Sequence, residues 1–194
     1  PESQIKMFVD RLAGGGNDEE IEEALTQARE SLKLGDIGGA AQAFAAVLSA
    51  DPENTKAIAG LARCYLTGGD RERALETLEM TPPEKANDPD IAGVRAALDL
   101  SKGAADGGGA DLGPLRAKVE ANPGDHQARY DLADALAGQG KLEEAVDQLL
   151  TIVEKDREWN DQAARKQVLK IFEAAGLMSD VAKAGRRRLS ALLF

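Results

Sequence analysis

Residues 35–40 read GDIGGA and residues 69–74 read GDRERA. The glycine, the aspartate and the final alanine of the first stretch therefore return 34 residues later, in the same order. Around both stretches the apolar residues follow the three- and four-residue spacing of amphipathic helices, so each Gly-Asp pair predicts a short turn between two helices. A helix pair of this size cannot bury its apolar face alone and requires a neighbouring pair.

A second internal match has an offset of 71 residues. The identical positions are Pro52, Ala57, Leu61, Ala62, Gly69, Glu72, Ala74 and Leu78, which correspond to Pro123, Ala128, Leu132, Ala133, Gly140, Glu143, Ala145 and Leu149. Composition does not explain so many identities in one register. Helix pairs that repeat every 34 residues are typical of tetratricopeptide arrays, which bind other proteins. The sequence therefore predicts an all-α, right-handed tetratricopeptide-like solenoid of about five helix pairs over residues 17–194.

The same spacing predicts where the individual helices lie. The expected ranges are 18–34, 37–50, 53–67, 71–80, 89–102, 112–121, 160–175 and 178–193, with the copy of the second pair following Pro123. Residues 103–109 (GAADGGG) interrupt the third pair and are expected to form a mobile loop. This loop lacks the GK[ST] ending of a phosphate-binding loop. The fifth pair is expected to begin at an Asn160-Asp161 cap.

Composition narrows the class of protein. Hydrophobic residues make up 43% of the chain and aromatic residues only 4%, and runs of β-branched residues are nearly missing, so strands are not expected. The single cysteine, Cys64, cannot form an internal disulfide, which favours a reducing, cytoplasmic location. We find no signal peptide and no apolar stretch of the roughly 20 residues that a membrane span needs, so we expect a soluble protein without membrane contact.

The net charge of −10 is unevenly distributed. Residues 165–194 contain seven Lys and Arg and two acids, a balance of +5, which leaves −15 for residues 1–164. An acidic body repels phosphate, so we expect no nucleic-acid partner and interpret the charges as a solvated surface.

The candidate binding residues lie on the first helices of the pairs, which line the inner face of such arrays. We place Tyr65, Leu66, Tyr130 and Leu136 near that face, where apolar side chains would hold hydrophobic segments of other polypeptides. Packing in the seam between helices is the alternative for the same residues.

The last helix combines basic and apolar residues at the end of the sequence. The residues concerned are Arg186, Arg187, Leu192, Leu193 and Phe194. In one interpretation this helix folds back and closes the solenoid. In the other, it docks in an acidic, hydrophobic groove of a larger chaperone.

Three further residues have structural and functional interpretations. Cys64 is expected to be a buried structural thiol, with a redox-sensing thiol as the alternative. His126 is expected to face solvent or cap a helix, because no second ligand stands at metal-binding spacing. Trp159 is expected to anchor the fifth pair against the fourth, with ligand contact as the alternative. The sequence indicates no catalytic, cofactor-binding or metal-binding residue, and no enzyme.

Two segments carry a family resemblance: residues 122–150 (NPGDHQARYDLADALAGQGKLEEAVDQLL) and residues 158–172 (EWNDQAARKQVLKIF). They resemble the C-terminal repeats of bacterial thioredoxin-like co-chaperones, the chaperedoxins. Residues 2–12 are similar to the last helix of a thioredoxin fold, so residues 1–14 would be the remnant of that domain. The CxxC active-site region has no counterpart here.

The resemblance implies a cytoplasmic holdase that takes part in cell redox homeostasis. It would bind unfolded or oxidatively stressed client proteins and pass them to chaperonin or Hsp70-type machines. The Lys, Asn and Arg residues with which some tetratricopeptide domains clamp acidic chaperone tails have no match in this chain. Two alternatives remain. The repeats would be an oligomerisation or scaffolding arm, which forms a homodimer, or the substrate selector of a thioredoxin-type oxidoreductase.

Overall fold

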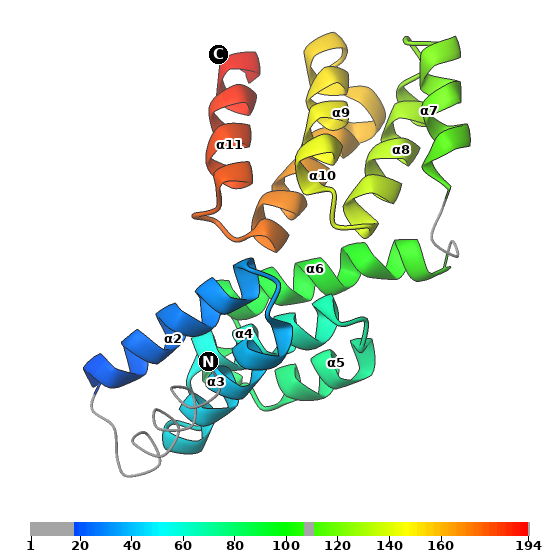
Figure 1. The fold of residues 1–194 in the computed structure, drawn as a ribbon. Coiled ribbons are helices and arrows are strands. Elements are labelled where there is room, and N and C mark those ends of the chain that lie inside the picture. Colours follow the sequence, from blue (N-terminus) through cyan, green and yellow to red (C-terminus); the bar gives the residue numbers. More distant parts are fainter. Residues whose placement is uncertain (1–17, 107–110, 194) are drawn as a thin grey trace. The chain divides into compact units, whose positions relative to one another are not determined.

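The computed structural model describes residues 18–106 and 111–193, and these ranges contain helices and no strand. They form two compact units that divide between Val94 and Arg95 (Figure 1). The first unit contains α2 (Asp18–Lys33), α3 (Ile37–Ala50), α4 (Thr55–Thr67), α5 (Arg71–Glu79), the short 3-10 helix Pro83–Lys85 and the start of α6 (Pro89–Asp106). The second contains the rest of α6, α7 (Leu112–Ala121), α8 (His126–Gly138), α9 (Leu142–Lys155), α10 (Trp159–Ala175) and α11 (Asp180–Leu193). The all-α prediction is confirmed, whereas the expected helix over residues 1–14 lies outside the described residues.

In the first unit, α2 packs against α3, α3 against α4 and α4 against α5, and α2 also packs against α4. The side chain of Asp36 accepts a hydrogen bond from the Gly39 amide and caps α3, and Asp70 caps α5 through the Arg73 amide. Such caps satisfy amides that lack a partner inside the helix. The two aspartates of the 34-residue repeat are therefore helix caps.

Close packing in the first unit depends on small residues. Ala40, Ala57, Ala62 and Ala74 are fully buried where helices meet. A Cβ atom placed on Gly60 would lie 2.3 Å from the ring of the buried Phe44. The absence of a side chain at Gly60 is therefore what lets α4 approach this ring.

The second unit continues the series of packed helices. From α7 to α11 each helix packs against the next, α9 also packs against α11, and α8 packs against α10 (Figure 1). The core includes Leu132, Leu149, Val168 and Phe172, each at most 3% exposed. Residues Ala96 and Leu100 of α6 belong to the same core.

Two expectations about the chain path are wrong. Helix α6 continues through Gly103 to Asp106, so the first part of the expected GAADGGG loop is helical, and residues 107–110 lie outside the described residues. Helix α10 (Trp159–Ala175) has non-helical backbone angles at Asn160, Asp161 and Gln162, so these residues interrupt it near its start instead of forming the expected Asn160-Asp161 cap. Within the described ranges, we find no helix with the length and apolarity of a membrane span.

Candidate protein-binding surface

Three aromatic rings meet where α8 and α10 lie side by side. The Tyr130 ring is centred 5.5 Å from the Trp159 ring in a tilted arrangement, and the His126 ring meets Trp159 edge-on at 6.2 Å. All three side chains are half-buried. Aromatic side chains that are partly buried and partly exposed to solvent offer apolar contact area together with a polar group. Side chains of this kind are common in protein–protein interfaces. The expectation that Trp159 anchors the fifth pair against the fourth is confirmed.

Asp134 extends this aromatic cluster along α8. Its carboxylate accepts a 2.9 Å hydrogen bond from the Gln167 side chain of α10. Burial raises the pKa of Asp134, and the nearby Lys170 opposes this change. Burial also raises the pKa of the Tyr130 hydroxyl, and the carboxylates of Asp134 and Asp131 add to the shift. We call His126, Tyr130, Asp134, Trp159 and Gln167 the α8–α10 strip.

The chain next to Trp159 adopts an unusual backbone. Asn160, Asp161 and Gln162 have φ angles of 46°, 53° and 63°, which form a left-handed turn without glycine. Each residue in this region costs roughly 1–3 kcal/mol, so surrounding bonds must hold it. The Gln162 amide donates to both carboxylate oxygens of Glu158, at 3.2 and 3.0 Å, and its oxygen accepts from Arg165 at 3.1 Å.

The corresponding helix of the first unit is α4. Its Tyr65 and Leu66 are half-buried, and the Arg73 guanidinium lies 5.8 Å from the centre of the Tyr65 ring. Burial lowers the pKa of Arg63, and the charge of Asp90 opposes that change. The predicted Tyr65 and Leu66 therefore present part of their surface to solvent.

Leu136 requires a correction. It is only 1% exposed and belongs to the core of the second unit, so in this conformation it cannot offer a surface to a partner. The alternative interpretation from the sequence, in which Leu136 packs in the seam between helices, is therefore the correct one. The helical direction explains the difference, because Leu136 lies on another side of α8 from Tyr130.

The C-terminal helix is attached to the core of its unit. Leu189 is 6% exposed, and Leu192 and Leu193 are partly buried against the same core. Arg188 forms an ion pair with Asp147 of α9, and Arg157 donates a hydrogen bond to the Leu193 carbonyl at 3.5 Å. Residues 189–193 thus close the end of the second unit, as the first interpretation of this helix expects, and Phe194 lies outside the described residues.

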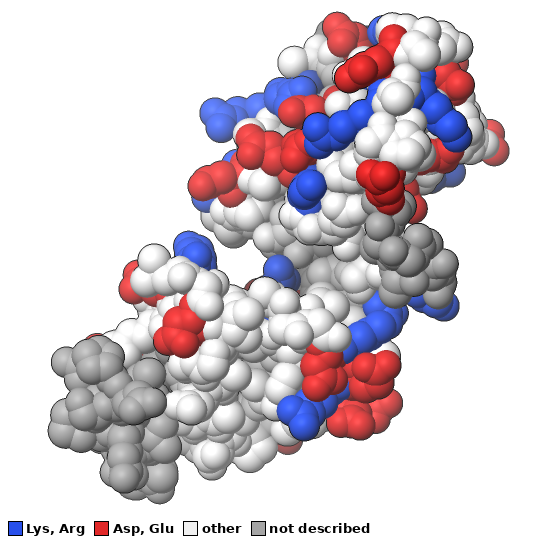
Figure 2. Space-filling view, turned by 45° about the vertical axis from the view of Figure 1, so that its right-hand side comes forward, with Lys and Arg blue, Asp and Glu red and all other residues white. Residues whose placement is uncertain are grey.

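The basic residues of α11 divide into two groups. Arg186 and Arg187 are exposed, whereas Arg188 is paired with Asp147. On the face of the second unit drawn in Figure 2, basic and acidic side chains are interspersed. Mixed charges of this kind favour solubility and give no single-sign surface on this face for phosphate.

The other residues discussed from sequence have plain structural positions. Cys64 is 1% exposed, and burial raises the pKa of its thiol to about 11, so the expectation of a buried structural thiol is confirmed. His126 does not cap α8: Asp125 does so, accepting a hydrogen bond from the Ala128 amide at 2.9 Å. Among the described residues, no group of three or more His, Cys, Asp and Glu side chains could hold a metal ion.

Sequence reasoning missed Asp134 and Gln167. A signal for Asp134 was present, since His126, Tyr130 and Asp134 are spaced four residues apart and share one helix face. Gln167 gave no such signal, because its role depends on the packing of α10 against α8.

Comparisons with known proteins agree with the repeat architecture. Two models described as tetratricopeptide repeat match residues 31–98 and 104–194. Cellulose synthase 1 operon protein C of Komagataeibacter xylinus is 31% identical over 114 residues, which is 57% of this chain and 8% of that protein. The chain thus matches a small part of that relative.

A solved structure covers most of the chain. It is a domain of protein VP0806 from Vibrio parahaemolyticus, described as of unknown function, with 25% identity, a TM-score of 0.42, and coverage of 89% of this chain and 99% of that one.

The two family matches and the helix pairs lead to the same conclusion about the family of this chain. Residues 31–98 and 104–194 belong to the tetratricopeptide repeat family, whose members are protein-interaction modules.

Proposed function

We propose that this chain is the polypeptide-binding region of a thioredoxin-like co-chaperone that holds unfolded client proteins. The observation that carries the proposal is the α8–α10 strip, where half-buried Tyr130 and Trp159 rings lie beside the desolvated Asp134 carboxylate. A client segment would place apolar side chains on the rings and donate backbone N–H groups to the carboxylate. Binding of this kind is non-covalent and needs no catalytic group. The resemblance of residues 122–150 and 158–172 to co-chaperone repeats supports the same function.

The test is binding of a permanently unfolded client, such as a reduced and carboxymethylated globular protein. We expect the chain to bind this client, to suppress aggregation of a heat-denatured enzyme, and to change the fluorescence of Trp159, its single tryptophan. Tyr130→Ser should weaken binding at least fivefold, while the exposed Lys141→Ala should not. Circular dichroism establishes that both variants are folded. No binding by the wild type would contradict the proposal.

The proposed chaperone partner is a chaperonin or an Hsp70-type chaperone. Because Leu189, Leu192 and Leu193 pack on the core of the second unit, we assign the contact to the exposed Arg186 and Arg187. Reversing both charges to Glu should abolish binding to the purified chaperone at low salt and leave client holding intact. Reversing the exposed Lys118 and Lys141 is the matched control. Equal binding by both double variants would remove the assignment. The cytoplasmic location stays a prediction from the cysteine content.

A further inference from the structure

A second carboxylate, Asp131, lies beside the α8–α10 strip. It follows Tyr130 directly on α8 and is exposed to solvent. Its negative charge adds to the raised pKa values of both Tyr130 and Asp134, so its field reaches the strip. Asp131 accepts a 2.7 Å hydrogen bond from the Gln127 side chain and forms no ion pair with a described residue. The strip therefore has an accessible negative charge at its edge.

The carboxylate of Asp134 is only half used by the chain. Its Oδ1 accepts the hydrogen bond from Gln167 at 2.9 Å. Its Oδ2 is not buried, and no donor of the described residues contacts it. A charged donor from a partner gives a shorter and stronger hydrogen bond to such an oxygen than a neutral donor does. Asp134 can therefore accept a cation from outside the chain.

The basic side chains of α10 do not neutralise Asp131. The Lys170 ammonium lies 3.5 Å from the carboxylate of Asp99 on α6 and forms an ion pair with it. Arg165 donates its hydrogen bond to the side-chain oxygen of Gln162 at 3.1 Å. Lys166 is exposed and is not within ion-pair distance of a carboxylate in the described ranges. A further positive charge at the strip thus has carboxylates to meet.

The two large rings of the strip add a second attraction for a cation. Tyr130 and Trp159 are half-buried with their ring centres 5.5 Å apart, so each presents part of its surface to solvent. The face of an aromatic ring attracts a cation that lies over it. A guanidinium group suits this surface better than an ammonium group, because it is flat, stacks on rings and carries several N–H donors. Rings and carboxylates together therefore match an arginine side chain.

The repeat does not require these side chains. The residues 71 positions before Tyr130, Asp131 and Asp134 are Ala59, Gly60 and Arg63. The first unit thus forms the corresponding helix with no aromatic ring and no carboxylate at these positions. Because packing of the helix pair does not explain the aromatic and acidic residues of the second unit, they are candidates for recognition.

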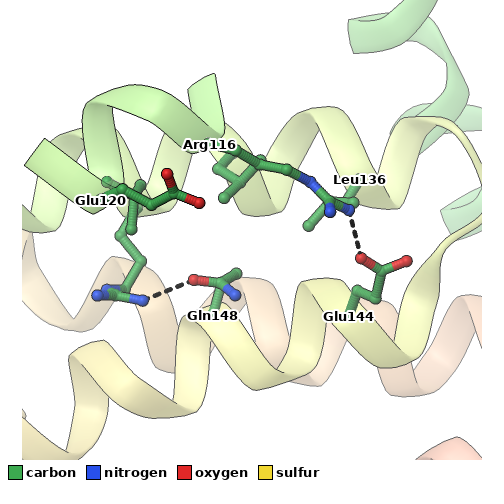
Figure 3. A pocket seen from close by; sticks show the side chains of 8 residues that line it. Arg116, Glu120, Leu136, Glu144 and Gln148 are labelled. Atoms are coloured by element: carbon green, nitrogen blue, oxygen red, sulfur yellow. Dashed lines mark hydrogen bonds and ion pairs between the residues drawn. The ribbon is translucent and has the colours of Figure 1, made fainter. Parts of the chain in front are cut away.

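A groove between α7 and α9 provides a contrast within the same unit. Figure 3 shows its charged groups: Arg116 pairs with Glu144 at 2.6 Å, and Gln148 accepts a hydrogen bond of the same length from Arg129. Glu120 at this groove is exposed and forms no ion pair with the residues that the structure describes. No aromatic ring lines the groove. Glu120 is therefore a matched control carboxylate, accessible but without rings beside it.

We propose that the α8–α10 strip binds an arginine side chain of an extended polypeptide. The guanidinium lies against the rings of Tyr130 and Trp159. Its N–H groups donate to the Asp131 carboxylate and to Asp134 Oδ2. Since a carboxylate oxygen accepts more than one hydrogen bond, Asp134 also remains available to a backbone N–H. The assignment rests on the proposed polypeptide-binding function and narrows its clients to segments that contain arginine.

The test is a titration of the full chain with the blocked pentapeptide acetyl-Gly-Ser-Arg-Ser-Gly-amide, followed by NMR. Trp159 gives the single indole N–H signal of the chain, and we expect the peptide to shift it. The same peptide with citrulline, which has the shape of arginine without the charge, should bind at least tenfold more weakly. A lysine peptide should bind at least threefold more weakly, because an ammonium group does not stack.

Protein variants locate the site. Asp131→Asn should weaken binding of the arginine peptide at least fivefold, whereas Glu120→Gln, which removes the same charge from the control groove, should change it less than twofold. Circular dichroism establishes that both variants are folded. Equal binding by the two variants would overturn the inference. So would the absence of a shift at Trp159, and so would equal affinity for the arginine peptide and either the citrulline or the lysine peptide.

A client experiment separates this inference from the proposed function. The unfolded client is compared before and after enzymatic conversion of its arginines to citrulline. We expect the conversion to weaken client binding at least fivefold. A chain that holds both forms equally well loses this inference alone, and one that binds the arginine peptide without holding any client loses the proposed function alone.

Discussion

The helix pairs α4–α5 and α8–α9 are copies in sequence, yet corresponding positions have different roles. Arg63 and Asp134 occupy the same position, 71 residues apart, and have opposite charges. Burial favours the neutral form of both side chains, because it lowers the pKa of Arg63 and raises the pKa of Asp134. A charge on the first helix of the following pair opposes each shift: Asp90 for Arg63 and Lys170 for Asp134. In both copies this position is therefore a half-buried contact between first helices, whereas the charge of the residue differs between the copies.

The pairs also differ in their second helices. Helix α5 has 9 residues and α9 has 14. The Thr81-Pro82-Pro83 stretch ends the shorter one, since proline cannot continue a helix. The longer α9 packs against α8, α10 and α11.

The largest expected effect comes from the leucine that both pairs share. Leu149→Ala should lower the free energy of unfolding by about 2–5 kcal/mol, because Leu149 is fully buried in the core of the second unit. Leu78→Ala, at the end of the short α5 and 5% exposed, should cost less. Urea unfolding measures both, and an equal or greater loss at Leu78 would contradict the comparison.

The next effect separates Gly60 from its counterpart Asp131. Gly60→Ala should cost about 1–2 kcal/mol, since the new methyl group meets the buried Phe44 ring and only part of the strain is offset by helix propensity. Asp131 is exposed, and Asp131→Ala should change stability by less than about 0.5 kcal/mol. Thermal unfolding of the two variants gives the answer, and a neutral Gly60→Ala would mean that Phe44 can move.

A smaller effect concerns the start of each second helix. Asp70 caps α5, whereas Lys141, at the same position before α9, makes no capping bond with its side chain. Asp70→Ala should cost about 1 kcal/mol, and Lys141→Asp should gain about 0.5–1 kcal/mol. Denaturant midpoints measure both changes. If Lys141→Asp gives no gain, the geometry before α9 does not permit a cap.

The smallest effect is a pH dependence at Asp134. Its pKa is raised in the folded state, so protonation favours folding, and this residue adds stability as the pH falls through the raised value toward the ordinary 3.8. Above that range the ionised form costs stability. Asp134→Asn should remove this pH dependence. Relative to the wild type, the free energy of unfolding of the variant should be higher at pH values above the raised pKa of Asp134, and this advantage should disappear below pH 3.8. A difference that does not vary with pH would contradict the assignment.

Most of the fold was predictable because the repeat fixes local structure. The Gly-Asp turns fix helix ends within about one residue, as at Ile37 and Arg71. Gly69 and Gly140 have φ angles of 83° and 75°, which few other residues adopt. The left-handed turn after Trp159 was not predictable, since its sequence contains no glycine and reads as an ordinary helix cap.

The binding surface was only partly predictable. Helical spacing predicted Tyr65, Tyr130 and Leu136 near the inner face; the two tyrosines are half-buried, whereas Leu136 lies in the core and was placed incorrectly. The hydrogen bond from Arg129 of α8 to Gln148 of α9 gave no signal in the sequence. A contact of this kind is set by the packing of two helices and leaves no periodic pattern.

The buried Cys64 has a practical consequence. A thiolate is the reactive form, and with a pKa of about 11 and 1% exposure this thiol is shielded from maleimide reagents at neutral pH. A cysteine introduced on the surface would then be the sole labelled position in the native chain. Fluorophores or spin labels can therefore be attached to either unit without first removing the natural cysteine.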